Sequence, residues 1–211
     1  MAAPRHTRRA FVAWTLLTPA APALAQRPKV VTVLGDSITA GYGLPLAAAL
    51  PNQLHLALTK LGVPNLVRAA GVSGDTLADG LARVDFSVQK DTDVAVVALG
   101  GNDLLQGQDV GRARASLDGI VKKLQVRRIG VVIAGIAAPS EVGGPYARDF
   151  NAAFATVART RGAPLYPDLL AGVGRNAALK QRDGIHPNAR GVQIIAARLA
   201  PIVAKALAAR R

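Results

Sequence analysis

Cysteine is absent from this chain of 211 residues, and aromatic residues make up only 4% of it. Without thiols the chain has no disulfide, no thiolate metal site and no cysteine nucleophile. The small number of aromatic rings disfavours a surface that stacks nucleic acid bases. Apolar residues nevertheless make up 50% of the chain. We therefore expect one domain with a sizeable core of alanine, valine, leucine and isoleucine.

Acidic residues are also scarce, since 13 of them oppose 26 lysines and arginines, and Glu141 is the only glutamate. The resulting formal charge of +13 is compatible with binding to nucleic acid or to an anionic membrane surface. The basic residues are scattered along the chain, however, and they form no dense run. We therefore predict a solvated basic surface and no nucleic acid partner.

The first 25 residues have the features of an export signal. Three arginines precede a short apolar stretch, and the segment closes on the small-residue pattern Ala23-Leu24-Ala25. Pro19 and Pro22 interrupt the apolar part of the segment, which is too short for a membrane span. The adjacent Arg8 and Arg9 resemble a twin-arginine signal, with the Sec route as the alternative.

From this leader we predict that residues 1–25 are removed and that residues 26–211 form the mature domain. The mature protein is then periplasmic or secreted and has no stable insertion into a membrane. Removal of the three leader arginines lowers the formal charge from +13 to +10.

Short apolar runs alternate with longer amphipathic ones from Lys29 onward. The apolar runs are typical of strands buried on both faces, and they cover residues 30–34, 66–70, 94–99, 129–136 and 165–166. Helical spacing of apolar residues occurs at 50–61, 76–88, 112–124, 146–159 and 191–208. This alternation predicts an α/β domain with three layers, in which helices cover both faces of a central, mostly parallel, five-stranded sheet. Residues 139–145 and 180–188 are expected to be loops.

Small polar residues follow the first three predicted strands. Asp36 and Ser37 come after the first strand, Ser73-Gly74-Asp75 after the second, and Asn102-Asp103 after the third. Ligands bind at the carboxyl ends of the strands in parallel sheets of this kind. We therefore expect these residues to meet at one edge of the sheet.

Acyl transfer by a serine needs a histidine that accepts its proton and an aspartate that holds the histidine in one tautomer. His55 lies in a predicted helix away from the polar clusters, and we interpret it as a surface or packing residue. Asp183 and His186 are spaced on a turn so that the carboxylate reaches the near ring nitrogen and the far nitrogen is left for a serine. A purely structural interpretation of both segments is the alternative, because Ser37 and Asn188 are also typical helix N-cap residues.

Four short blocks follow one another along the chain, namely Gly35-Asp36-Ser37-Ile38, Gly71-Val72-Ser73-Gly74-Asp75, Gly100-Gly101-Asn102-Asp103 and Asp183-Gly184-Ile185-His186-Pro187. In this order they resemble the GDSL or SGNH hydrolase family, with most similarity to its periplasmic arylesterase and thioesterase I (lysophospholipase L1-like) group. The resemblance covers about residues 30–208 and includes Gly80-Leu81-Ala82-Arg83. It implies an SGNH, flavodoxin-like fold.

The same resemblance implies a role for each residue of the site. Ser37 would be the nucleophile, with His186 as its base and Asp183 as the partner of the histidine. The backbone N–H groups of Ser37 and Gly74 and the side chain of Asn102 would form the oxyanion hole. Loss of one such donor typically costs ~3 kcal/mol of transition-state stabilisation.

The implied activity is hydrolysis of carboxylic esters or thioesters through an acyl-Ser37 intermediate. Short acyl esters, aryl esters, acyl-CoA and lysophospholipids are the candidate small-molecule substrates. One alternative is a carbohydrate O-acetyl esterase on the same scaffold, and another is a non-catalytic protein that binds anionic surfaces or glycans. No cofactor and no metal are expected. Asp36, Asp75 and Asp103 are interpreted as structural residues that bond backbone N–H groups, and a metal site built from them is the alternative. The sequence carries no signal for an oligomeric state.

Overall fold

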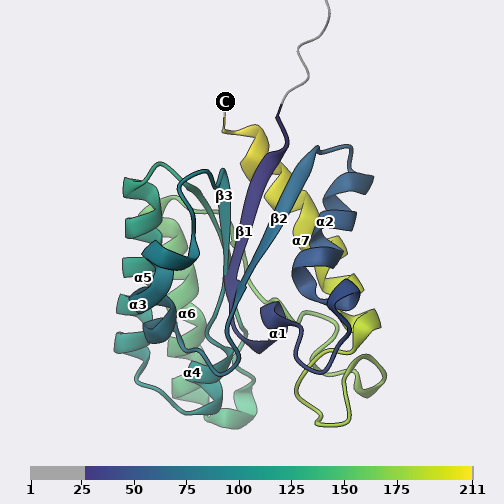
Figure 1. Ribbon diagram of the computed structural model, residues 1–211. Coiled ribbons are helices and arrows are strands. Elements are labelled where there is room, and N and C mark those ends of the chain that lie inside the picture. Colours follow the sequence, from purple (N-terminus) through teal and green to yellow (C-terminus); the bar gives the residue numbers. More distant parts are fainter. Residues whose placement is uncertain (1–26, 211) are drawn as a thin grey trace, which may run out of the picture.

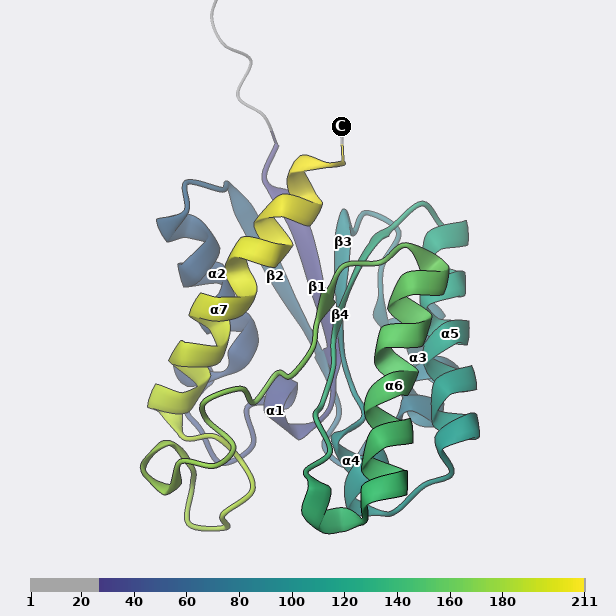
Figure 2. The same ribbon diagram turned by 180° about the vertical axis from the view of Figure 1, so that it is seen from behind.

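A parallel β-sheet lies between two layers of helices in the computed structural model, which describes residues 27–210 (Figures 1 and 2). Its strands are β1 (Lys29–Gly35), β2 (Asn65–Gly71), β3 (Val94–Ala98), β4 (Gly130–Ala134) and β5 (Leu165–Tyr166). They lie in the order β2-β1-β3-β4-β5, and every neighbouring pair is parallel. The predicted α/β class and five-stranded sheet are thus confirmed. The predicted export signal, residues 1–25, lies outside the described residues.

The central strands are buried on both faces. Every residue of β3 is buried, as is every residue but the first of β1 and β4. This burial explains why these strands appear in the sequence as continuous apolar runs rather than as alternating patterns. The edge strand β2 has no fully buried residue.

The helices form two layers. One layer contains α3 (Leu77–Ser87), α5 (Val110–Val126) and α6 (Gly144–Arg161), and the other contains α2 (Leu50–Lys60) and α7 (Ala189–Ala208) (Figures 1 and 2). In the first layer α5 packs against both α3 and α6, and in the second α2 packs against α7. Asn188 is the N-cap of α7, as predicted from the sequence. Thr76 is the N-cap of α3 and forms a capping box with Asp79.

The helix α7 is long and apolar enough to cross a membrane by length and composition alone. Its apolar residues recur at helical spacing on one face, however, and that face is buried in the domain core. Ile195, Leu199 and Val203 have no or almost no exposed surface. We therefore assign α7 to the core of the domain.

Two short helices at the carboxyl edge of the sheet were not predicted from the sequence. These are α1 (Ser37–Ala40) and α4 (Gly101–Leu105), and each is too short for an apolar period to develop. Helix α6 also begins earlier than predicted, at Gly144, inside a segment expected to be a loop. The reason is Pro145, which fits the first turn of a helix because no N–H is needed there.

Candidate active site

Ser37 lies where β1 passes into α1, at the carboxyl edge of the sheet. Asp36 is the N-cap of α1, and its Oδ1 accepts a hydrogen bond of 3.0 Å from the backbone N–H of Ile38. Gly41 ends the helix in a left-handed conformation with φ of 77°. The turn that carries Ser37 is therefore fixed at both ends. The first N–H groups of a helix have no acceptor within it, so α1 does not use the N–H of Ser37.

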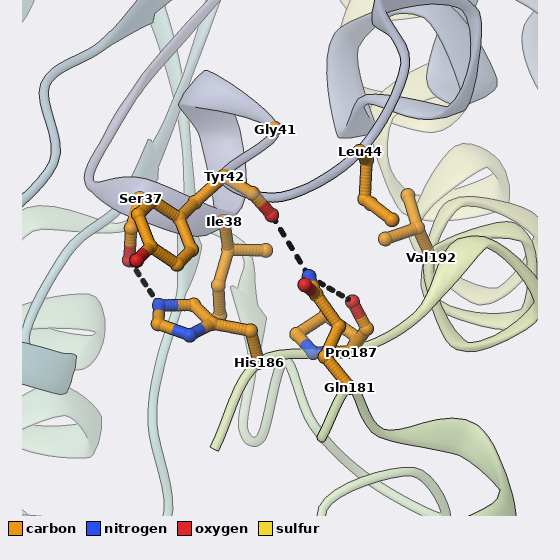
Figure 3. Close-up of a pocket in the computed structure, with 9 residues that line it drawn as sticks. All are labelled: Ser37, Ile38, Gly41, Tyr42, Leu44, Gln181, His186, Pro187 and Val192. Atoms are coloured by element: carbon orange, nitrogen blue, oxygen red, sulfur yellow. Dashed lines mark hydrogen bonds between the residues drawn. The ribbon is translucent and has the colours of Figure 1, made fainter. Parts of the chain in front are cut away.

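Two consecutive hydrogen bonds link Ser37 to His186 and Asp183. The Oγ atom of Ser37 is 2.9 Å from Nε2 of His186 (Figure 3), and Nδ1 of His186 is 2.6 Å from Oδ2 of Asp183. The other carboxylate oxygen of Asp183 accepts hydrogen bonds from the backbone N–H groups of Ile185, at 2.9 Å, and of His186, at 3.1 Å. One carboxylate thus orients both the loop and the imidazole ring.

The charge of Asp183 sets the tautomer of His186. The hydrogen bond from His186, followed by the one from the N–H of Ile185, lowers the pKa of Asp183 to about 2. The carboxylate is therefore ionised at neutral pH and acts only as an acceptor. The neutral imidazole must then carry its proton on Nδ1, so that Nε2 can accept the proton of Ser37. This is the protonation state that a general base requires.

Tyr42 and Gln181 both contact His186 (Figure 3). The ring centroid of Tyr42 is 4.8 Å from that of His186. Gln181 donates a hydrogen bond of 2.8 Å from Nε2 to the carbonyl of Tyr42 and one of 2.8 Å from its backbone N–H to the carbonyl of His186. Gln181 therefore joins the loop after α1 to the loop that carries the histidine. Gln181 was not predicted from the sequence, where its place five residues before His186 was the only available signal.

A shallow pocket, too small to enclose a water molecule, lies beside the serine and the histidine. Its lining residues are Ser37, Ile38, Gly41, Tyr42, Leu44, Gln181, His186, Pro187 and Val192 (Figure 3). The wall away from the hydrogen-bonded groups is made of aliphatic side chains.

Gly74 and Asn102 lie on the loops that follow β2 and β3. The side-chain Nδ2 of Asn102 donates a hydrogen bond of 2.9 Å to the carbonyl of Asp75, the residue after Gly74. Gly74 has a φ of 92°, a left-handed conformation that favours glycine. The backbone N–H of Val72 donates to the carbonyl of Gly35 at 3.1 Å. Asn102 is therefore hydrogen-bonded to the loop that carries Gly74, and that loop is tied to β1 two residues before the serine.

The three aspartates of these blocks have structural partners, but one prediction about them is wrong. Asp36 and Asp103 bond backbone N–H groups as expected, and Oδ2 of Asp103 accepts from Leu77 at 2.9 Å. Asp75 instead accepts a hydrogen bond of 2.5 Å from Nε of Arg83, because α3 brings that guanidinium within reach. Burial raises the pKa of Asp36 to about 6 and also raises that of Asp103. Residues 27–210 contain no cluster of three or more His, Asp or Glu side chains that could hold a metal ion.

His55 lies outside the site, as the sequence predicts. Its ring is exposed on α2, and its Nδ1 is hydrogen-bonded to Oδ1 of Asn65 at 2.9 Å. The other histidine after the leader, His186, is therefore the one that contacts Ser37.

Known proteins share this arrangement of sequence and fold. Residues 33–194 match the model of the GDSL-like lipase/acylhydrolase family. The chain is 33% identical over 160 residues to esterase TesA of Pseudomonas aeruginosa, covering 75% of this chain and 80% of that protein. It is 32% identical over 157 residues to thioesterase 1/protease 1/lysophospholipase L1 of Escherichia coli, covering 74% of each.

The fold agrees with these matches. The crystal structure of AlinE4, an SGNH-hydrolase family esterase, superposes with a TM-score of 0.72 at 40% sequence identity, covering 86% of this chain and 98% of that one. Sequence and structure thus agree over most of the domain, and the chain belongs to the GDSL-like lipase/acylhydrolase family, as a hydrolase of the SGNH type.

Proposed function

We propose that this hydrolase cleaves carboxylic esters or thioesters through an acyl-Ser37 intermediate. The single observation that carries the proposal is the hydrogen-bonded chain from Ser37 through His186 to Asp183, with contacts of 2.9 and 2.6 Å. The names of the similar proteins, which include an esterase and a thioesterase, support this class of substrate.

In the first half-reaction His186 takes the proton of Ser37 at Nε2 as Oγ attacks the carbonyl carbon of the ester. The resulting imidazolium is stabilised by the carboxylate of Asp183 and then gives its proton to the leaving alcohol or thiol. In the second half-reaction a water molecule attacks the acyl-enzyme, with His186 again as base. The acid is released, and the proton returns to Ser37.

Negative charge develops on the carbonyl oxygen in both half-reactions. We assign its stabilisation to the backbone N–H groups of Ser37 and Gly74 and to the side chain of Asn102. A primary amide has two N–H donors, and in Asn102 one of them is engaged by the carbonyl of Asp75. The other donor is left for the oxyanion.

We infer the substrate class from the surroundings of Ser37. The pocket beside it is shallow, and Val192 in its lining is fully buried, so we expect short acyl esters of aryl alcohols to be cleaved more readily than long-chain esters. We further infer from the leader, residues 1–25, that the enzyme acts in the periplasm or outside the cell.

The test is hydrolysis of p-nitrophenyl acetate and butyrate by the purified protein. Ser37→Ala and His186→Ala should each lower kcat by about 10⁴-fold or more, and a fluorophosphonate should label the wild-type protein at Ser37. His55→Ala is the matched control, because this histidine lies away from the pocket, and it should leave kcat within about twofold of wild type. Absence of both turnover and labelling in folded wild-type protein would rule the proposal out.

A further inference from the structure

Arg83 has an unusual set of partners for a side chain that contacts none of the proposed catalytic atoms. From α3 its Nη2 donates to the carbonyl of Gly35 at 2.8 Å, and its Nη1 donates to the carbonyl of Ala70 at 3.0 Å. Its Nε donates to Oδ2 of Asp75 at 2.5 Å, and its Nη1 also donates to Oγ of Ser87 at 3.0 Å. One guanidinium thereby joins the carboxyl ends of β1 and β2 to the loop that follows β2.

Further hydrogen bonds connect these partners to the proposed oxyanion hole. Gly35 is two residues before Ser37, and its carbonyl also accepts the N–H of Val72 at 3.1 Å. Asp75 follows Gly74 and offers its own carbonyl to the side chain of Asn102 at 2.9 Å. The carboxylate of Asp75 is thus held by Arg83 while its backbone holds Asn102.

The Arg83–Asp75 pair is poorly exposed, with 19% of the arginine side chain and 12% of the aspartate side chain accessible to solvent. A shielded pair of this kind is screened less by salt and water than a surface pair. Gly80, one turn earlier on α3, allows this helix to lie close to the sheet, because a Cβ there would be 2.2 Å from Cδ1 of Leu99. The close approach of α3 brings the arginine to the sheet edge.

We propose that Arg83 is a positioning residue for the oxyanion hole, acting through Asp75 on Asn102. This inference rests on the proposed function, since it concerns the transition state of the same ester hydrolysis. Three of the four acceptors of Arg83 lie on β1, on β2 and on the loop after β2. These segments lead to Ser37 and to Gly74. The planar fork of arginine reaches all of them at once, whereas the single ammonium of lysine does not.

The test is Arg83→Lys, which keeps the charge and removes the fork. Interactions with the oxyanion matter mainly in the transition state, so kcat for p-nitrophenyl butyrate should fall by about 30- to 100-fold while KM stays within about threefold. Arg161→Lys is the matched control, because Arg161 contacts Asp118 through two nitrogen atoms far from the pocket. It should leave both constants within about twofold of wild type.

A double-mutant cycle separates positioning from general structural support. If Arg83 acts through Asp75 on Asn102, Arg83→Lys should cost at most about fivefold in an Asn102→Ala background. Asp75→Asn keeps the shape and the backbone carbonyl of this residue and should lower kcat, again with KM unchanged. This variant also serves as the test if Arg83→Lys does not fold.

Three results would overturn the inference while leaving the hydrolase intact. These are full kcat in Arg83→Lys, a fall in kcat that is equally large in the Asn102→Ala background, and full kcat in Asp75→Asn. Failure of the proposed function itself looks different, because wild-type protein and the Arg161→Lys control would then lack turnover as well.

Discussion

The substitution Asp183→Asn tests the tautomer of His186, on which the proposed mechanism depends. It preserves the shape of the side chain but adds an NH₂ group. The two backbone N–H groups at 185 and 186 donate to Oδ1 of Asp183 at 2.9 and 3.1 Å. In the variant these donors require the amide oxygen, so the NH₂ group must face Nδ1 of the imidazole. Nδ1 then becomes the acceptor, and Nε2 carries a proton where it should receive one from Ser37.

The size of the effect follows from these contacts. Turning the amide the other way would leave two backbone donors unpaired, at about 1 kcal/mol each for this partly exposed loop. That preference disfavours the active tautomer by about 30-fold. The variant also loses the charged hydrogen bond that stabilises the imidazolium, and we expect this loss to lower kcat by about a further 30-fold. We therefore expect kcat to fall by about 10³-fold.

The assay is steady-state hydrolysis of p-nitrophenyl butyrate, with thermal melting as the control for folding. KM should stay near the wild-type value, because Asp183 does not line the pocket. Asp183→Ala imposes no tautomer on the imidazole, so the Asn variant should be no more active than the Ala variant. An Asn variant that keeps kcat within tenfold of wild type, or that clearly exceeds the Ala variant, would refute this reasoning.

Two further predictions concern the buried acid beside the nucleophile and the leader. Burial raises the folded-state pKa of Asp36 from 3.8 to about 6, so the folded protein binds this proton more tightly, and the contribution of Asp36 to stability falls as pH rises from about 4 to 6. Asp36→Asn keeps an acceptor for Ile38 and should remove that fall in stability, which amounts to about 3 kcal/mol. Denaturant unfolding of both proteins at pH 4 and pH 7 measures the difference, and an identical pH dependence in the two would contradict this prediction. Expression of the full chain in a bacterium should yield a periplasmic protein whose N-terminal residue is Gln26, and an intact N-terminus on a cytoplasmic product would contradict the assignment of the leader.

Much of this structure could be predicted from the sequence because the relevant signals are local. The central strands β1, β3 and β4 are buried and appear as unbroken apolar runs, and shorter apolar segments marked the edge strands β2 and β5. These runs also placed the polar residues at the carboxyl ends of the strands. Asp183 and His186 lie three residues apart on one turn, so their contact follows from spacing. Ser37 was identified through its companions, since a serine after a strand is equally typical of a helix N-cap.

The features that were missed depend on contacts between distant segments. Arg83 is eight residues from Asp75 and 48 residues from Gly35, and only the docking of α3 on the sheet brings the three together. Gln181 is 139 residues from Tyr42, and nothing in its own neighbourhood indicates that contact. Helices α1 and α4 are too short to have an amphipathic pattern, although they carry Ser37 and Asn102.

The contact between Ser37 and His186 joins positions 149 residues apart in the chain. During synthesis the nucleophile leaves the ribosome early, whereas its base comes shortly before the last helix. A chain that stops short, or whose C-terminal segment fails to dock, therefore has an intact serine and no means to activate it. Turnover of a chromogenic ester accordingly serves as a direct measure of the fraction of chains that have folded to completion.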